Sequence, residues 1–373
     1  MTESPMTEST APDLLYTDTE DGLRSAVRAL LADHGGPAAV VARLEYPQPY
    51  DEGLWQTLAA GIGAAGLLIP EKLGGQGAGH REAAVVLEEL GRAATPAPYL
   101  TSAVVATEIL LACVPESAEA ADLLGRLAGG RGLCVAALPL TLGPGGPLPA
   151  DATPPAGGTV KAVADAVAAD TFLVHSASGL YAVPAEAVTL SPQVPLDLTR
   201  PLAAVTPREA AGTRLAGPET ARAAVERGLL AGAGLLASEQ LGLADWCLTE
   251  TVAHLRTRHQ FNRPVGSFQA LKHRVAALWL ETASARAAAR AAADALATGA
   301  PDAPLLVSVA QAYCSGVAVR AAEECVQLHG GIGMTWEHPA HVYLKRAKAD
   351  ASAFGSAAFH RTRVAALTRL PPP

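Results

Sequence analysis

Cysteine is scarce in this sequence, and its placement excludes two kinds of stabilised fold. The chain has 373 residues and 5 cysteines, at positions 113, 134, 247, 314 and 325, with no Cys-x-x-Cys pair. Cysteines that are odd in number and widely scattered predict neither a disulfide framework nor a zinc site, so we expect no metal. We interpret them as small buried hydrophobic residues in a reducing compartment.

Aromatic and charged residues are also few, at 4% and 17%, whereas 50% of the chain is hydrophobic. A disordered chain shows the opposite balance, so the composition predicts a globular protein, and the length predicts about two or three domains. Acidic residues outnumber basic ones by 36 to 28, which gives a formal net charge of −8. That sign argues against nucleic acid and anionic membranes as partners.

The sequence shows no targeting or membrane-spanning segment. Residues 1–17 begin with a polar, acidic stretch that has neither the basic start nor the apolar core of a signal peptide, and we expect them to be disordered. No apolar stretch reaches the roughly 20 residues that a membrane span needs. We therefore expect a cytoplasmic protein without a membrane span.

Three zones of different composition follow one another. Residues 18–130 carry apolar residues at helical spacing, 131–218 hold short runs bounded by turn residues, and 219–373 return to long helical patterns rich in Ala and Leu. We predict an α+β fold with an N-terminal α-helical domain, a small middle β domain and a C-terminal four-helix bundle. The last zone is predicted to hold four helices, at 219–256, 267–298, 303–329 and 340–370.

A Gly-x-Gly-x-x-Gly pattern at 61–66 resembles a dinucleotide-binding loop, but its context does not fit. Such a loop needs a strand before it and a helix after it. Residues 54–60 have a helical pattern, and Leu67-Leu68-Ile69-Pro70 follows the glycines. We interpret these glycines as a helix end made of small residues and reject a Rossmann fold.

Residues 256–269 read R-T-R-H-Q-F-N-R-P-V-G-S-F-Q, where one helix ends in a basic cluster and a tight turn leads to the next. Ser267 is the predicted N-cap of that helix. Forked arginine donors and the N–H groups of a helix start suit phosphate. On spacing alone, an anion site and an ordinary basic corner between helices remain equally open.

Residues 327–339 read Q-L-H-G-G-I-G-M-T-W-E-H-P. Paired glycines allow a backbone to approach a ligand closely, and Gln327 offers both a donor and an acceptor. Taken alone, the segment is equally a helix C-cap followed by a loop. We interpret His329 as a packed loop histidine and Glu337 as a cap or ion-pair residue.

Together these two segments resemble the acyl-CoA dehydrogenase family. The first is similar to that family's R-x-x-F-G-x-P-I-x-x-F-Q segment and the second to its Q-x-x-G-G-x-G segment. The N-terminal zone is also similar, through Gly63-Ala-Ala-Gly66-Leu, Ile69-Pro70-Glu71 and Leu87-Glu88-Glu89-Leu90-Gly91-Arg92. The resemblance covers nearly the whole chain in the same α–β–α order. It implies FAD as cofactor and an acyl-CoA thioester as substrate, oxidised between Cα and Cβ.

The resemblance also implies which residues bind the cofactor. In the family, these two segments hold the adenosine–pyrophosphate half of the FAD bound by the neighbouring subunit. The corresponding residues here are Arg258, Phe261, Gln269, Gln327, Gly330 and Gly331. Asn262 replaces the usual glycine of the turn, and it is a residue that tolerates a positive φ.

The catalytic base is missing from both places where the family puts it. The usual glutamate precedes a Gly-Thr or Gly-Ser step, where this chain has Phe354, and the alternative position on an earlier helix is Gly232. Neither residue can accept a proton. Glu239, two helical turns beyond Gly232, is the candidate substitute, but a glutamate at a helix surface or interface fits the pattern better.

The β zone also lacks the family's flavin-binding segments. Ala136-Ala137-Leu138-Pro139-Leu140 stands where a polar L-T-E-P-x-x-G-S segment is expected, and no tryptophan lies between Trp55 and Trp246. The adenine half of a cofactor site is therefore present, whereas its flavin half and base are not. This matches one subunit of the heterotetrameric bacterial members, paired with a homologous partner.

Two alternatives stay open. One is a self-sufficient homo-oligomeric FAD enzyme that uses Glu239 as its base, and the other is a non-redox scaffold subunit of the same fold. The resemblance further implies an electron-transfer flavoprotein as a possible electron acceptor. The acyl group is not specified by the sequence.

Overall fold

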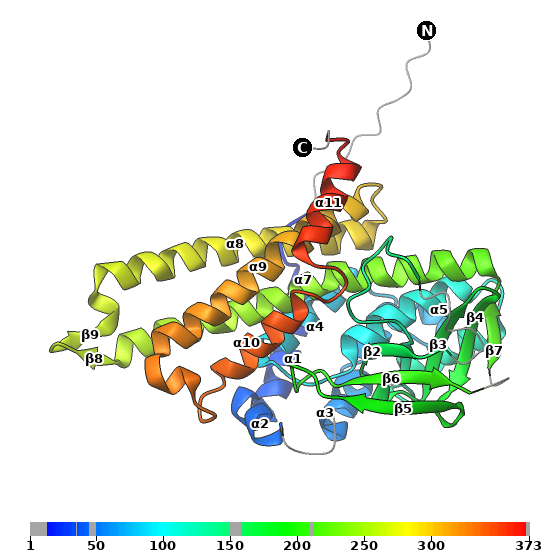
Figure 1. The fold of residues 1–373 in the computed structure, drawn as a ribbon, viewed down its shortest axis with the longest axis horizontal. Coiled ribbons are helices and arrows are strands. Elements are labelled where there is room, and N and C mark those ends of the chain that lie inside the picture. Colours follow the sequence, from blue (N-terminus) through cyan, green and yellow to red (C-terminus); the bar gives the residue numbers. More distant parts are fainter. Residues whose placement is uncertain (1–12, 35, 45–49, 149–157, 209–211, 371–373) are drawn as a thin grey trace, which may run out of the picture.

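The computed structural model describes residues 13–34, 36–44, 50–148, 158–208 and 212–370. Its elements follow the order helices, strands, helices (Figure 1). The predicted fold class is confirmed. Most of the N-terminal segment predicted to be disordered lies outside the described residues. Residues 13–17 are described, and within them the Leu15 carbonyl accepts hydrogen bonds from Arg81 and Arg290.

The N-terminal part is helical, with short 3-10 and π-helical turns between the α-helices. Thr17 and Glu20 form a capping box at the first helix, which satisfies two free N–H groups there. The Gly-x-Gly-x-x-Gly pattern lies at the end of a π-helical turn that is followed by a 3-10 turn. No strand precedes it among the described residues, so it is not a Rossmann loop. The elements are α1 (Asp18–Asp33), α2 (Gly36–Arg43), α3 (Glu52–Gln56), η1 (Thr57–Gly61), η2 (Ala64–Gly66), η3 (Glu71–Leu73), α4 (His80–Ala93), η4 (Tyr99–Ala106), α5 (Thr107–Cys113) and α6 (Ala118–Ala128).

The middle part has two small sheets, ordered β1-β3-β4-β7 and β2-β6-β5. Alternate residues of β3 point to opposite faces. Phe172 and Val174 join a small core between the sheets, whereas Leu173 joins the large core shared with the helices. The sheets thus pack against each other and against the helices. The strands are β1 (Cys134–Ala136), β2 (Val160–Ala164), β3 (Thr171–Ser176), β4 (Gly179–Pro184), β5 (Val188–Gln193), β6 (Leu202–Pro207) and β7 (Thr213–Ala216), with 3-10 turns η5 (Ala166–Ala168) and η6 (Ala185–Ala187).

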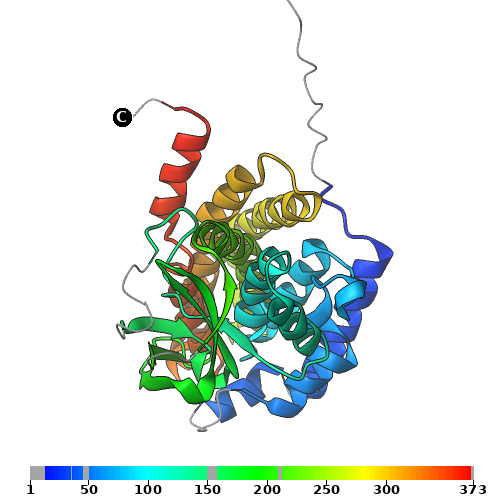
Figure 2. The same cartoon turned by 90° about the vertical axis from the view of Figure 1, so that its right-hand side faces the viewer.

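The C-terminal part is a bundle of long helices that extends away from the sheets (Figures 1 and 2). It consists of α7 (Pro218–Thr257), the hairpin β8 (His259–Gln260) and β9 (Arg263–Pro264), η7 (Val265–Ser267), α8 (Gln269–Thr298), α9 (Ala303–His329), η8 (Gly330–Met334), α10 (Ala340–Asp350) and α11 (Ala357–Leu367). Two sequence-based details are wrong. Ser267 is not an N-cap, because it lies in η7 and the cap residue of α8 is Phe268. The last predicted helix is two helices, because Phe354 and Gly355 have φ of 51° and 99°.

Helix α9 corrects another expectation. The stretch Ala303–Met334 is long and apolar enough to cross a membrane by length and composition alone, with a mean hydropathy of 1.4 in its most apolar window. However, 56% of that window is buried inside the protein, and α9 packs against α7, α8, α10 and α11. The apolar character of α9 is accounted for by its place in the middle of the bundle.

Helices α4 and α7 meet at a backbone contact made possible by two glycines. A Cβ on Gly242 would lie 2.0 Å from the Glu88 carbonyl oxygen, and one on Gly91 would lie 2.1 Å from the Glu239 carbonyl oxygen. Both obstacles are backbone atoms, so they cannot move without separating the helices. The contact joins the N-terminal helices to the bundle.

We expect Gly242→Ala to lower the free energy of unfolding by about 1–3 kcal/mol or more, because the two helices must move apart. Gly22→Ala is the matched control, since a Cβ there meets nothing within 4 Å in α1. That substitution should be neutral or stabilising by up to about 1 kcal/mol. Denaturant unfolding of both variants measures the difference; equal stabilities would contradict the close contact.

Candidate functional site

The hairpin between α7 and α8 presents the first group of predicted cofactor residues. Phe261 and Asn262 form its turn, with φ of 52° and 60°, so the positive φ expected for Asn262 is confirmed. Phe261 is 86% exposed. Its positive φ is an unfavourable backbone conformation for a bulky residue. The Arg263 guanidinium lies over the Phe268 ring, with its Cζ 3.9 Å from the ring centroid, and this contact stabilises the hairpin.

Arg258 and Gln269 lie on either side of this hairpin, and both are exposed. Within the described part of the chain, the Arg258 guanidinium has no ion-pair or hydrogen-bond partner, and the same is true of its neighbour Arg256. Three arginines at positions 256, 258 and 263 therefore form a basic surface that no carboxylate neutralises there. Such a surface suits a phosphate or diphosphate group.

The second group of predicted residues lies where α9 ends, at the same end of the bundle as the hairpin (Figure 1). Gln327 is exposed on the last turn of α9, and Gly330 has a φ of 63° just beyond it. A Cβ on Gly330 or Gly331 would meet nothing within 4 Å, so the backbone there is open to an approaching group. The two segments singled out in the sequence thus face outward from one end of the molecule.

The two positions where a base is expected are in contact with each other. A Cβ on Gly232 of α7 would lie 2.8 Å from Cε1 of Phe354 and 2.8 Å from Cγ2 of Val105. The Phe354 ring therefore occupies the space beside Gly232. Among the described residues, no carboxylate lines the small cavity at Phe354, whose walls come from η4, β1, β2, α7 and the segment that follows β1.

This cavity has a volume of about 30 Å³. The Leu138–Leu140 segment, which stands where flavin-binding residues are expected, forms one wall, and the Leu140 carbonyl accepts a hydrogen bond from the Phe354 N–H at 2.7 Å. Ligand pockets usually have volumes of about 300–1,000 Å³. The space is filled by the chain's own apolar side chains and backbone.

Glu239 lies away from this cavity, inside a buried ionic cluster. It is 1% exposed, and its Oε1 accepts hydrogen bonds from Arg200 at 2.5 Å and from Arg346 Nε at 2.8 Å. Burial opposes its charge, but the two guanidinium groups outweigh burial and hold the pKa of Glu239 below its ordinary value. A carboxylate held in this way is a poor proton acceptor, so the geometry favours a structural role for Glu239.

The same cluster joins all three parts of the fold. Arg200 follows the strand β5, Arg346 lies on α10, and Arg346 also donates to the carbonyl of Thr95 at 3.2 Å. Asp350 lies 3.4 Å from Arg200, and burial, opposed by Arg200, raises its pKa to about 7. The sequence did not indicate this cluster, because its members are far apart along the chain and carry no motif.

The residues present fit one half of FAD and not the other. Arg258, Gln269 and Gln327 are exposed polar groups at an open bundle end, as expected for the adenosine–diphosphate half of a cofactor held by another chain. The cavity at Phe354, beside the segment where flavin-binding residues are expected, has about 30 Å³ and mostly apolar walls. A second cavity, of about 400 Å³, lies between α2 and the Pro192–Leu202 segment and includes none of the predicted site residues.

Fold and site together define a helical–β–helical protein with a basic surface at the bundle end and a cavity of about 30 Å³ at Phe354. Two family models match the chain: "Acyl-CoA dehydrogenase, N-terminal domain" over residues 17–130 and "Acyl-CoA dehydrogenase, C-terminal domain" over 221–367. Acyl-CoA dehydrogenase IpdE2 of Mycobacterium tuberculosis is 38% identical over 330 residues, which cover 88% of this chain and 91% of that relative. The chain belongs to the acyl-CoA dehydrogenase family.

Solved structures agree with this assignment. The ChsE4-ChsE5 complex from Mycobacterium tuberculosis has a chain that superposes with a TM-score of 0.83 at 26% identity, covering 97% of this chain and 100% of that one. A variant of the Tcur3481-Tcur3483 steroid ACAD gives a TM-score of 0.81 at 28% identity, covering 94% and 98% of the respective chains. Both of these similar structures come from complexes named for two different proteins.

Proposed function

We propose that this chain is the base-lacking subunit of a heteromeric, FAD-dependent acyl-CoA dehydrogenase. It completes the cofactor site of a homologous partner by contributing Arg258, Phe261, Gln269, Gln327, Gly330 and Gly331 to the adenosine–diphosphate half of that partner's FAD. The partner supplies the flavin contacts and the carboxylate that removes the α-proton. Bound FAD provides the hydride acceptor for desaturation of the acyl-CoA thioester.

The proposal rests above all on the contact between Phe354 and Gly232. These are the two positions where the family resemblance places a base, and here a phenyl ring packs into the space that a side chain at Gly232 would need. A cavity of about 30 Å³ leaves no room for a flavin ring beside an acyl group. The exposed residues predicted to bind the adenosine–diphosphate half of FAD would then act only in the cofactor site of another chain.

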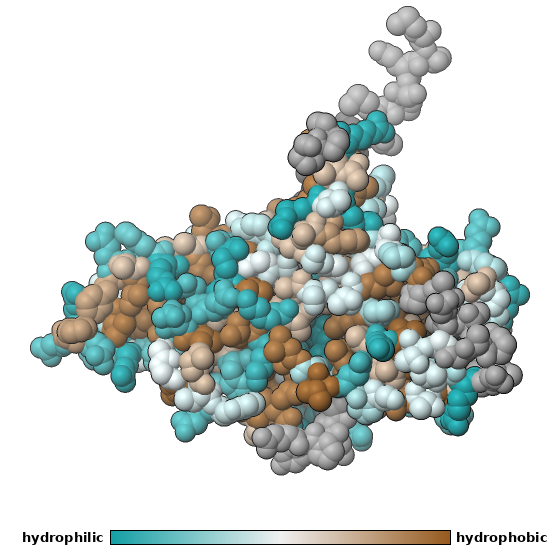
Figure 3. Space-filling model, viewed as in Figure 1, coloured by the Kyte–Doolittle hydropathy of each residue, from teal (hydrophilic) through white to brown (hydrophobic). Residues whose placement is uncertain are grey.

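The surface of the bundle supports association with a partner. Figure 3 shows hydrophobic side chains at the surface of the left end of the molecule, where β8 and β9 lie. Exposed apolar side chains that gather in one region mark interaction surfaces. Those of the hairpin, α8 and the segment after α9 are Phe261, Trp279, Leu280, Ile332, Met334 and Trp336.

The test is to purify the full chain alone and after co-expression with a homologous acyl-CoA dehydrogenase subunit that has the glutamate. Flavin content and mass in solution are then measured. We expect a colourless chain alone and a heteromeric complex that holds half as many flavins as chains. A chain that purifies alone as a yellow, active homo-oligomer would overturn the proposal.

We also propose an electron-transfer flavoprotein as the electron acceptor, which the family resemblance implies. Reduced flavin in the complex would be reoxidised by an electron-transfer flavoprotein, which can be tested by adding that protein to the complex with an acyl-CoA substrate. The cytoplasmic location remains a prediction from the sequence.

A further inference from the structure

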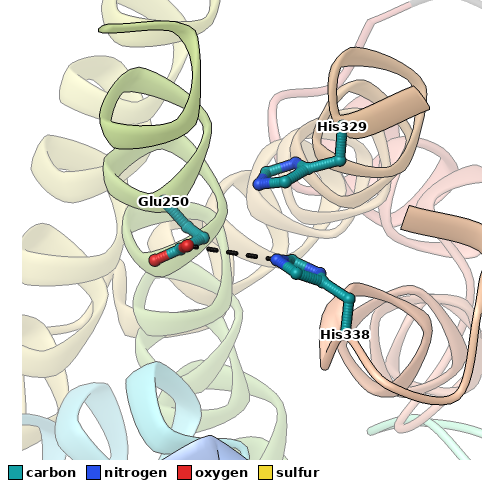
Figure 4. A group of neighbouring side chains, drawn as sticks. All are labelled: Glu250, His329 and His338. Carbon is teal, nitrogen blue, oxygen red and sulfur yellow. Dashed lines mark ion pairs between the residues drawn. The ribbon is translucent and has the colours of Figure 1, made fainter. Parts of the chain in front are cut away.

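Three side chains that the proposed function does not use converge beside the cofactor-donating segment (Figure 4). Glu250 comes from α7, His329 from the last turn of α9, and His338 from the segment that precedes α10. One ligand atom of each residue lies within 4.8 Å of those of the other two. In Figure 4 the two imidazole rings and the carboxylate face a common space.

His329 is held in the orientation of a metal ligand. Its Nδ1 lies 2.7 Å from the Cys325 carbonyl oxygen, so Nδ1 carries the proton and donates it, which leaves the Nε2 lone pair free. The residue is 5% exposed, and its buried Nε2 has no hydrogen-bond partner among the described residues. A buried nitrogen of this kind is costly unless something binds it. A bond from Nδ1–H to a backbone carbonyl is also the usual support of a metal-ligating histidine.

We propose that Glu250, His329 and His338 form a binding site for one divalent transition-metal ion of the zinc class. Two imidazole nitrogens and one carboxylate oxygen are a ligand set that such ions accept, with a fourth position left for water or another ligand. The sequence predicted no metal site because these ligands lie on three separate elements and follow no short spacing pattern. The ion would link α7, α9 and α10 next to Gln327 and Gly330.

Binding requires small local changes. His338 Nε2 lies 3.9 Å from Glu250 Oε1, and ligands placed about 2.0–2.2 Å from a shared ion must come somewhat closer together. His338 Nδ1 also accepts the Ala340 N–H at 3.2 Å, and this bond is lost when Nε2 binds the ion and the proton moves to Nδ1. That N–H belongs to Ala340, the buried first residue of α10, so the loss of this hydrogen bond is a cost that metal binding must exceed.

Glu250 supplies the one negative charge of the ligand set. The neighbouring His254 ring, 4.3 Å from His329, has a pKa lowered by burial, by His329 and by Arg258, so positive charge also lies close to the site. An ion competes with protons for both imidazoles, so affinity falls as the pH is lowered.

The test uses the full chain, freed of any affinity tag and stripped of metal with a chelator, then titrated with Co²⁺ and afterwards with Zn²⁺. We expect visible absorption bands of coordinated Co²⁺ that saturate at one ion per chain and disappear when Zn²⁺ displaces it. Metal should also raise the melting temperature. No visible bands, or bands with more than one ion per chain and no saturation, would overturn the proposal.

Matched variants connect the signal to these residues. Glu250→Gln and His338→Gln change partly exposed side chains. Each should weaken Co²⁺ binding at least about tenfold, because even the loss of a residue that only supports a metal ligand typically lowers metal affinity 10- to 100-fold. His273→Gln is the control, since His273 is an exposed histidine on α8, and its binding should be unchanged. Equal affinity in all three variants would show that the ion binds elsewhere and would contradict the site. Circular dichroism confirms that each variant is folded, and the buried His329 is left unchanged for that reason.

Discussion

Glu239→Gln should lower the free energy of unfolding by about 3–5 kcal/mol. The substitution keeps the size of the side chain but removes the charge that pairs with Arg200 and Arg346, both of which are buried. Each guanidinium then remains in the protein interior without its principal counter-charge, and a buried unpaired charge is costly. Chemical denaturation monitored by far-UV circular dichroism measures the loss.

Glu323→Gln is the matched control for this experiment. Glu323 also forms an ion pair, with Lys348 at 2.6 Å, but both side chains are about half exposed, so the pair contributes at most about 1 kcal/mol. The same chemical change should therefore leave stability almost unaltered at this surface position. If Glu239→Gln were as stable as the control but abolished α-proton exchange by a flavin-bearing chain, Glu239 would be a base and the self-sufficient alternative would hold.

The second large effect is expected in the complex with a partner subunit. Arg258→Ala should raise the Kd of the complex for FAD about 10- to 100-fold, because a hydrogen bond to a charged group is worth about 1.5–3 kcal/mol. The free chain should keep its stability, since Arg258 is exposed and has no ion pair among the described residues. Flavin release on dilution, followed by fluorescence, measures the affinity.

Arg256→Ala provides the control for charge alone. Arg256 is exposed two residues earlier, at the end of α7, and is not among the residues predicted to contact FAD. Removing it lowers the positive charge of the same region by the same amount. Equal losses of FAD affinity in the two variants would mean that the bundle end acts only through its general charge, and would contradict a specific contact by Arg258.

The order of helical and strand segments along the chain could be predicted from the sequence, because the spacing of hydrophobic residues indicates the type of each segment. The pattern over 303–329 predicted α9 with the bounds that the structure shows. The division of the last helix could not be predicted in this way. Residues 340–370 are rich in Ala and helix-forming residues, and the break depends on the positive φ of Phe354, which packing against Gly232 stabilises.

The site was predictable only where it lies in contiguous segments. The two segments near 258 and 327 indicated the cofactor residues, and the structure places both groups at one end of the bundle (Figure 1). That prediction of their role stays untested by the fold. Contacts between distant residues were not accessible: neither the burial of Glu239 between Arg200 and Arg346 nor the convergence of Glu250, His329 and His338 follows from local pattern.

The closed internal site is tested most directly by titrating the isolated full chain with FAD. Visible absorption and quenching of flavin fluorescence report binding, and the mass in solution is recorded on the same sample. With the Phe354 ring beside Gly232 and a cavity of about 30 Å³, we predict no shift of the flavin spectrum and no stoichiometric binding. Saturable binding near one FAD per chain, with a perturbed flavin spectrum, would contradict the account.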